Sequence, residues 1–104
     1  MKINHSNIKK AKKFLDNEEC VAVPTETVYG LAANAYSDIA TKKIFQLKKR
    51  PRNNPLIVHY SNLNDLKKDC LINKEFLKLY KKFCPGPLTF ILPLKKKSKI
   101  SKNV

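Results

Sequence analysis

The 104-residue sequence is short of acidic residues, of glycines and of long apolar runs. No apolar run approaches the roughly 20 residues that cross a bilayer, and residues 1–14 form an amphipathic pattern rather than a secretory leader. These absences predict a soluble, cytoplasmic protein without a membrane partner. The length and the 42% hydrophobic content suit one compact domain, or part of one.

Cysteine is also scarce, since the chain has only Cys20, Cys70 and Cys84. The three lie far apart, are odd in number and form no CxxC pair or Cys/His cluster. Such a pattern indicates neither a disulfide framework nor a zinc site. We therefore expect reduced thiols with structural roles and no metal site.

The shortage of acids leaves a large positive charge, because 22 lysines and arginines face 8 acidic residues and give a formal +14. A surplus of this size attracts phosphates and speeds encounters with polyanions. Two interpretations stay open: a nucleotide or nucleic-acid partner, or lysines spread over helix faces in a composition that reflects genome bias. The segment KKRPR at 48–52 stands out because it holds both arginines at a predicted helix end.

Helical and strand periodicities alternate along the chain. They predict, in order, helix 6–18 capped by Ser6, strand 20–24, a helix from Ser37 or Asp38 to just before Pro51, strand 55–60, helices 62–69 and 73–83, and strand 88–94. This order predicts an α/β (α+β) fold, a sheet covered by helices. Residues 1–94 are expected to form the domain and residues 95–104 a Lys-rich tail or interrupted loop.

Polar side chains follow the first predicted strand abruptly in VAVPTETVYGLAANA, residues 21–35. Residues just beyond the carboxyl end of a strand often lie in a ligand-binding crevice, which makes Thr27 and Tyr29 candidates. Gly30 behind them permits close backbone approach. The predicted strand 55–60 ends near His59. We expect the hydroxyl and the imidazole on one rim, facing paired cations.

The paired cations are Lys48 and Arg50, near the predicted helix end. Arginine suits bidentate phosphate contact and lysine acts as a point charge. The glycines of a Walker loop are absent, so phosphate binding must rest on side chains. Each feature also has an ordinary structural interpretation, as turn residues, a hydrogen-bonded structural histidine or compensation of a helix dipole. Composition and spacing name no reaction.

Three motifs, PTETVYGLAANA, IFQLKKRPRNNPLIVH and FCPGPLTFIL, resemble in order and spacing the signatures of the YrdC-like family of threonylcarbamoyl-AMP synthases. The resemblance covers almost all of residues 8–94. It implies an open twisted sheet with flanking helices, YrdC/RibB-like and here truncated to the N-terminal half. It also implies a nucleotidyltransferase that condenses L-threonine, bicarbonate and ATP into threonylcarbamoyl-AMP, releasing pyrophosphate, for tRNA threonylcarbamoyladenosine formation.

The resemblance also assigns candidate site residues. The family's threonine-binding positions match Thr27, Tyr29 and His59, and its ATP-binding positions match Lys48, Arg50 and Asn54. Magnesium is implied as the companion of the nucleotide. Neither a catalytic nucleophile nor a metal ligand is implied, and PGPLT at 85–89 is expected to be a structural turn.

The family's later adenylate motif is absent, and Lys49 stands where an apolar residue or glycine is usual. We therefore expect weak or no synthase activity from the isolated chain, and a separately encoded C-terminal half is a candidate partner. Two alternatives stay open. One is a non-catalytic basic module that binds tRNA or double-stranded RNA, and the other is a regulatory or vestigial protein that binds nothing.

Overall fold

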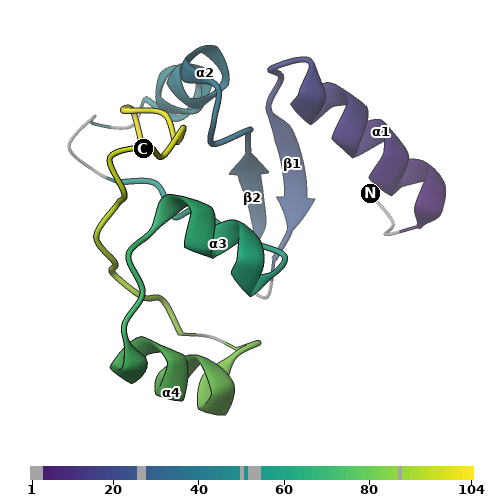
Figure 1. Cartoon of the computed structure of the whole chain (residues 1–104). Coiled ribbons are helices and arrows are strands. Elements are labelled where there is room, and N and C mark those ends of the chain that lie inside the picture. Colours follow the sequence, from purple (N-terminus) through teal and green to yellow (C-terminus); the bar gives the residue numbers. More distant parts are fainter. Residues whose placement is uncertain (1–3, 26–27, 50, 52–54, 87) are drawn as a thin grey trace. The chain divides into compact units, whose positions relative to one another are not determined.

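The protein, as a computed structural model, is described at residues 4–25, 28–49, 51, 55–86 and 88–104, which hold four helices and a small sheet (Figure 1). The elements in chain order are α1 (His5–Asp16), β1 (Val21–Pro24), β2 (Tyr29–Ala32), α2 (Asp38–Lys48), α3 (Leu63–Asp69) and α4 (Lys74–Phe83). The chain divides into two compact units: the first is Met1–Val58 with Ile100–Val104, and the second is His59–Lys99. None of the helices in the described ranges is long and apolar enough to cross a membrane.

Each described helix begins behind a side chain that accepts a backbone N–H from the first turn. The N-caps are Asn4, Ser37, Asn62 and Asn73, and each accepts from the residue three positions further on. Ser37 is one of the two predicted caps of α2. The prediction of Ser6 for α1 was wrong, because Asn4 takes that role and the helix starts one residue earlier. Both residue types are good N-caps, so the sequence did not separate them.

Two residues that follow α1, Glu18 and Glu19, cap the backbone carbonyls of its last turn. Glu18 has a left-handed backbone (φ 62°), and the N–H groups of Glu18 and Glu19 donate to carbonyls of the last helical turn. This is the Schellman arrangement, in which glycine is the usual left-handed residue. Lys43 of α2 donates to the carbonyl of Glu18 (3.1 Å) and pairs with the carboxylate of Glu19 (3.3 Å). One lysine thus ties α2 to the end of α1.

β1 and β2 form a β-hairpin, and Thr27 of the polar stretch that joins them lies outside the described residues. β1 and β2 pair antiparallel, from Val21 opposite Ala32 to Pro24 opposite Tyr29, and Thr25 N–H donates to the carbonyl of Val28 (3.1 Å). The chain returns as β2 directly after this connection, and the expected ligand-binding crevice at Thr27 and Tyr29 stays a prediction. A Cβ on Gly30 would lie 3.3 Å from Cγ2 of Thr25, so a larger residue there requires the threonine side chain to shift by a few tenths of an ångström.

The two later strands that the sequence predicts are not formed. Residues 55–60 and 88–94 have no strand, and the one pairing is an isolated bridge between Cys70 and Leu94. A strand needs the backbone ladder of a neighbour, and the described residues supply only this bridge. Ile91 is 98% exposed, so its segment is not the buried run that apolar composition suggested. The α/β class and the helix-flanked small sheet are as predicted.

The buried apolar side chains of the first unit come from β1 and α2. Val21 of β1 and Ala40, Ile44 and Phe45 of α2 are buried. Complete burial of a valine, isoleucine or phenylalanine side chain contributes roughly 1.5–3 kcal/mol. The apolar face of α1 is less covered, since Phe14 remains 56% exposed.

The last residues of the chain also belong to the first unit. Ser101 is buried, its N–H donates to the carbonyl of Ala35 (2.8 Å), and its hydroxyl donates to Asp38 at the start of α2 (2.5 Å). The amide of Asn103 donates to the carbonyl of Asp38 (3.2 Å). Residues 100–104 are therefore fastened to α2, although they lack regular structure and were predicted as part of a tail or loop. The predicted boundary at residue 94 stays a prediction.

The second unit packs α4 against the segment that follows it. Phe76 is buried and meets the ring of Phe90 edge-on, with centroids 4.9 Å apart. Gly86 lies in the turn between them, where a Cβ would run into the carbonyl oxygen of Phe83. The close approach explains a glycine in the predicted structural turn.

Candidate functional site

Three of the predicted site residues lie within the described part of the chain, namely Tyr29, Lys48 and His59, and three lie outside it, namely Thr27, Arg50 and Asn54. Tyr29 opens β2, Lys48 ends α2, and His59 opens the second unit, all with exposed side chains. Each unit stands as a separate body. The shared rim of hydroxyl, imidazole and cations therefore stays a prediction.

Lys48 is placed by the way α2 ends. Lys49 follows it as a left-handed C-cap (φ 51°), and its N–H donates to the carbonyl of Gln46 (3.4 Å). A cation in the last turn is favoured by the negative end of the helix dipole. Because Lys49 is left-handed, Lys48 is the last residue of α2. Its exposed ammonium group lies where an anion can approach from solvent.

His59 is followed by a residue that is firmly anchored. The hydroxyl of Tyr60 donates to Oδ2 of Asp69 (2.7 Å), and the hydroxyl of Ser98 donates to Oδ1 of the same carboxylate (3.0 Å). Asp69 is only 3% exposed. The sequence did not indicate that Asp69 is buried, because a buried aspartate and a solvated one at the end of a predicted helix look alike in the residues around them.

Burial governs two of the three described thiols, all of which are free. Desolvation raises the pKa of the Cys20 thiol; Lys43 opposes that shift and Glu19 adds to it. Desolvation, with the nearby charge of Asp69, likewise raises the pKa of Cys70. Both therefore remain protonated near neutral pH, which makes them poor nucleophiles and metal ligands. Within the described ranges, no group of three or more His, Cys, Asp or Glu is placed to hold a metal ion.

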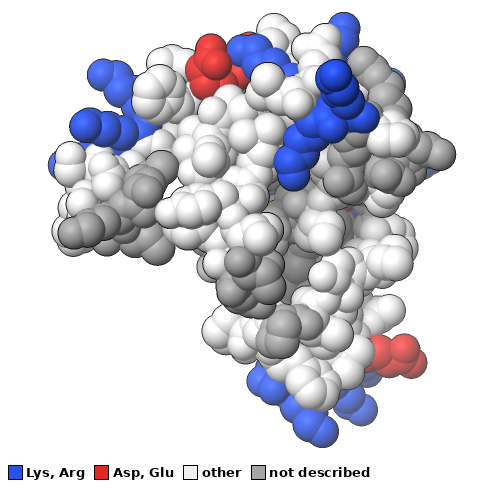
Figure 2. Space-filling model, turned by 180° about the vertical axis from the view of Figure 1, so that it is seen from behind, with Lys and Arg blue, Asp and Glu red and all other residues white. Residues whose placement is uncertain are grey.

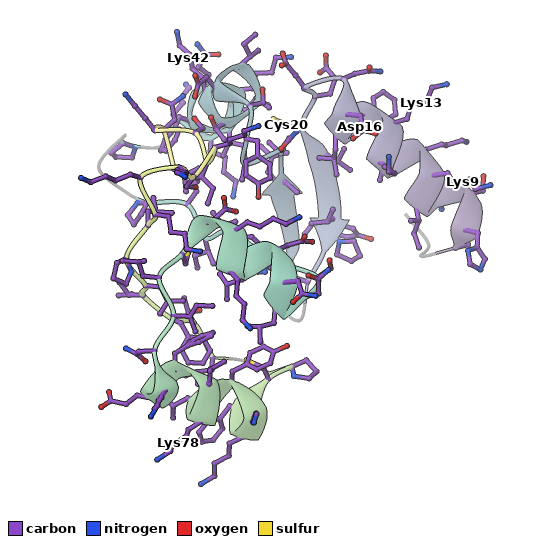
Figure 3. The ribbon with its side chains drawn as sticks, viewed as in Figure 1. Lys9, Lys13, Asp16, Cys20, Lys42 and Lys78 are labelled. Carbon is purple, nitrogen blue, oxygen red and sulfur yellow. The ribbon has the colours of Figure 1, made fainter. Side chains whose placement is uncertain are left out.

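Many lysines of the described surface are spread over separate helices, and others lie outside the helices in residues 95–102. Lys9 and Lys13 project from α1, Lys42 from α2 and Lys78 from α4 (Figure 3). The face in Figure 2 shows blue side chains at several separate places rather than in one field. Solvated helix faces thus carry part of the charge, and both interpretations of the positive surplus stay open.

A groove of about 330 Å³ lies between α1 and β1 in the first unit. It contains none of the predicted site residues that the structure describes. Its lining is mostly apolar and consists of Asn7, Lys10, Ala11, Phe14, Cys20, Val21 and Ala22. Neither Tyr29 nor Lys48, the described candidates of this unit, lines the groove.

Comparison with known proteins settles the family. The profile of the Sua5/YciO/YrdC family, described as "Telomere recombination", matches residues 13–104. The chain belongs to this family. The predicted YrdC-like membership is therefore confirmed.

Several curated Sua5/YrdC relatives share the name threonylcarbamoyl-AMP synthase. Those of Pyrococcus abyssi and Bacillus subtilis are 46% and 48% identical over 95 and 93 residues, which cover 88% of this chain and 27% of each relative. The relative from Psychromonas ingrahamii is 34% identical over 97 residues, covering 90% of this chain and 51% of the relative. The chain thus spans about a quarter to a half of the length of these relatives.

Solved structures agree with the sequence matches. P. abyssi Sua5 complexed with L-threonine superimposes with a TM-score of 0.89 at 40% identity, over 99% of this chain and 30% of that one. The H234A/Y235A variant of P. abyssi Sua5 gives the same TM-score at 41% identity over 98% of this chain. The Sua5/YrdC fold is therefore shown, and the chain spans about a third of the length of these solved chains.

Proposed function

We propose that the chain supplies the threonine-binding part of an L-threonylcarbamoyladenylate synthase. That enzyme joins L-threonine, bicarbonate and ATP into threonylcarbamoyl-AMP and pyrophosphate for tRNA modification. The observation that carries the proposal is the match of 99% of this chain, at a TM-score of 0.89, to a Sua5 structure that contains L-threonine. The shared name of the relatives supports the same reaction.

The threonine side of the proposed site consists of Thr27, Tyr29 and His59. Their hydroxyl and imidazole groups both donate and accept hydrogen bonds, as a ligand with an ammonium, a carboxylate and a hydroxyl requires. Tyr29 and His59 are exposed to solvent, so a small ligand reaches them without prior opening of a core.

The ATP side of the proposed site consists of Lys48, Arg50 and Asn54, with magnesium carried on the phosphates of the nucleotide. The amine of threonine adds to bicarbonate with loss of water and gives a carbamate. A carbamate oxygen then attacks the α-phosphorus of ATP, and pyrophosphate leaves. Cations offset the negative charge that gathers there, so the protein contributes orientation and electrostatic stabilisation rather than a nucleophile.

Full turnover is proposed to need more protein than this chain. The chain spans 27% of two synthase relatives and 51% of a third, so the rest of each relative has no counterpart here. We expect little pyrophosphate release from residues 1–104 alone and a gain when the remaining part of a family domain is added. Binding to tRNA or double-stranded RNA and cytoplasmic location stay predictions from charge and composition.

Titration of the chain with L-threonine tests the proposal. Isothermal calorimetry should detect L-threonine and should detect L-valine at least several-fold less tightly, because valine lacks the hydroxyl that the polar site would bind. His59→Ala should weaken threonine binding by about tenfold, the loss expected for one good hydrogen bond. His5→Ala, which removes the other histidine of the chain at the exposed start of α1, is the matched control.

Two results would contradict the proposal. One is the absence of any threonine binding, by heat or by NMR shift, in the presence and absence of Mg²⁺ and ATP. The other is an equal loss of affinity in His5→Ala and His59→Ala. Strong threonine-dependent pyrophosphate release from the chain alone would instead remove the need for further protein.

A further inference from the structure

The segment that ends at Tyr60 has a two-residue period of exposure. From residue 55 to residue 60, the odd positions are exposed and the even positions are partly buried. This period is typical of extended chain, in which successive side chains point to opposite sides. The direction of Tyr60 therefore sets the direction of His59.

Tyr60 is held on the inner side by a charged acceptor. Its hydroxyl donates to Oδ2 of Asp69 at 2.7 Å, a short bond of the kind that carboxylates accept. Asp69 is fixed in turn, because it ends α3, receives the hydroxyl of Ser98 and accepts the N–H of Lys95 at its carbonyl (2.7 Å). All these groups lie within the second unit, as does His59.

We propose that Tyr60 is a positioning residue for His59, acting through its hydrogen bond to the buried carboxylate of Asp69. With the tyrosine hydroxyl anchored, the backbone at residue 60 cannot rotate freely, and the imidazole of the preceding residue is kept on the solvent side. The ligand-binding consequence rests on the proposed function, since it takes His59 as a threonine contact. The orienting effect itself is a property of the second unit alone.

Preorganisation is the physical gain from such an anchor. A side chain that is already turned toward its ligand loses less conformational freedom on binding. Loss of the anchor should therefore lower affinity without removing any atom that touches the ligand. A purely structural role predicts something else, namely a lower Tm with unchanged affinity in the molecules that remain folded.

NMR of the His59 imidazole is the first test, with Tyr60→Phe as the variant. The substitution keeps the ring and removes only the hydroxyl. Tyr80→Phe is the matched control, because Tyr80 is similarly half-buried in the same unit and its ring centroid lies 5.9 Å from that of Phe76. Among the hydrogen bonds of the described residues, none involves the hydroxyl of Tyr80. We expect shifted signals and faster motion of the His59 ring in Tyr60→Phe and an unchanged ring in Tyr80→Phe.

A double-mutant cycle with L-threonine is the second test. Tyr60→Phe should weaken binding by about three- to tenfold, and the same change should have no effect in a His59→Ala background, because the effect passes through the imidazole. Asp69→Asn should show a smaller loss, since an amide oxygen still accepts the tyrosine hydroxyl. Additive losses from Tyr60→Phe and His59→Ala would overturn the inference.

The two tests separate this inference from the proposed function. If the wild-type chain binds no threonine while the His59 ring responds to Tyr60→Phe as expected, the proposed ligand is wrong and the positioning role stands. If threonine binds but the ring is the same in both proteins, the positioning role is refuted and the proposed function stands.

Discussion

Ser101→Ala is expected to loosen the C-terminal residues from α2 and to destabilise the first unit. The hydroxyl of Ser101 donates to Asp38 (2.5 Å) and accepts from Thr41 (3.1 Å) and from the N–H of Asn103 (3.1 Å). Thr41 is 2% exposed but keeps the carbonyl of Ser37 as a partner (2.8 Å), so it is not stranded by the change.

The substitution therefore removes two main contributions: the hydrogen bond to Asp38 and the acceptor of the backbone N–H of Asn103. Asp38 is exposed, so water replaces part of its loss. A hydrogen bond to a charged group contributes about 1.5–3 kcal/mol and a neutral one about 1, and with solvent compensation at Asp38 we expect about 1–2 kcal/mol in total. For a domain of this size, each kcal/mol of lost stability lowers Tm by about 4–8 °C.

Thermal and urea unfolding, followed by circular dichroism, measure this change. Lys102→Ala is the matched control, because Lys102 is exposed in the same segment and should leave Tm within about 2 °C, as surface substitutions usually do. Equal Tm values for wild type and Ser101→Ala would refute the reasoning, because the hydroxyl of Ser101 would then add nothing to the stability of the first unit.

Further predictions concern the end of α1 and the thiols. Glu18→Gly should stabilise the chain by about 0.5–1 kcal/mol in urea unfolding, because Glu18 has a left-handed backbone (φ 62°) that glycine adopts without strain. Asn17→Gly should destabilise the chain by a similar amount, because Asn17 has φ −89° and no such strain to relieve. Destabilisation by both changes would contradict this account. Cys20 should react with iodoacetamide more slowly than a free cysteine at pH 7 and should gain rate only above the usual thiol pKa, because burial raises its pKa and keeps the thiol protonated. Mass spectrometry at a series of pH values checks this order, and fast labelling of Cys20 in the folded chain at pH 7 would count against it.

Local signals in the sequence predicted the helices well. Ser37 before an apolar stripe located α2, and the helical spacing of Phe76 and its neighbours located α4. Such patterns depend on contacts within one or two turns, which a single sequence records. The hairpin was missed because YGLA contains a glycine and an alanine, both weak strand formers, and its identity depends on pairing with β1.

Non-local pairing accounts for most of the other differences. Thr41 and Ser101 meet across 60 positions of the chain, and nothing near Ser101 indicates this partner. Residues 55–60 include the β-branched pair Ile57 and Val58, yet composition does not supply the ladder that a strand needs. The candidate site residues came from motif resemblance, which assigns positions in the chain but not distances between side chains.

The caps of the helices have a consequence for the evolution of this basic surface. Asn4 and Asn73 cap with the side-chain oxygen, which aspartate also possesses, and the added negative charge suits the positive end of a helix. Asn62 differs, because its amide donates to the carboxylate of Asp65 (3.1 Å) and an aspartate there would oppose it. Drift from asparagine to aspartate at the first two positions would lower the net charge by two while retaining every lysine and both helix starts.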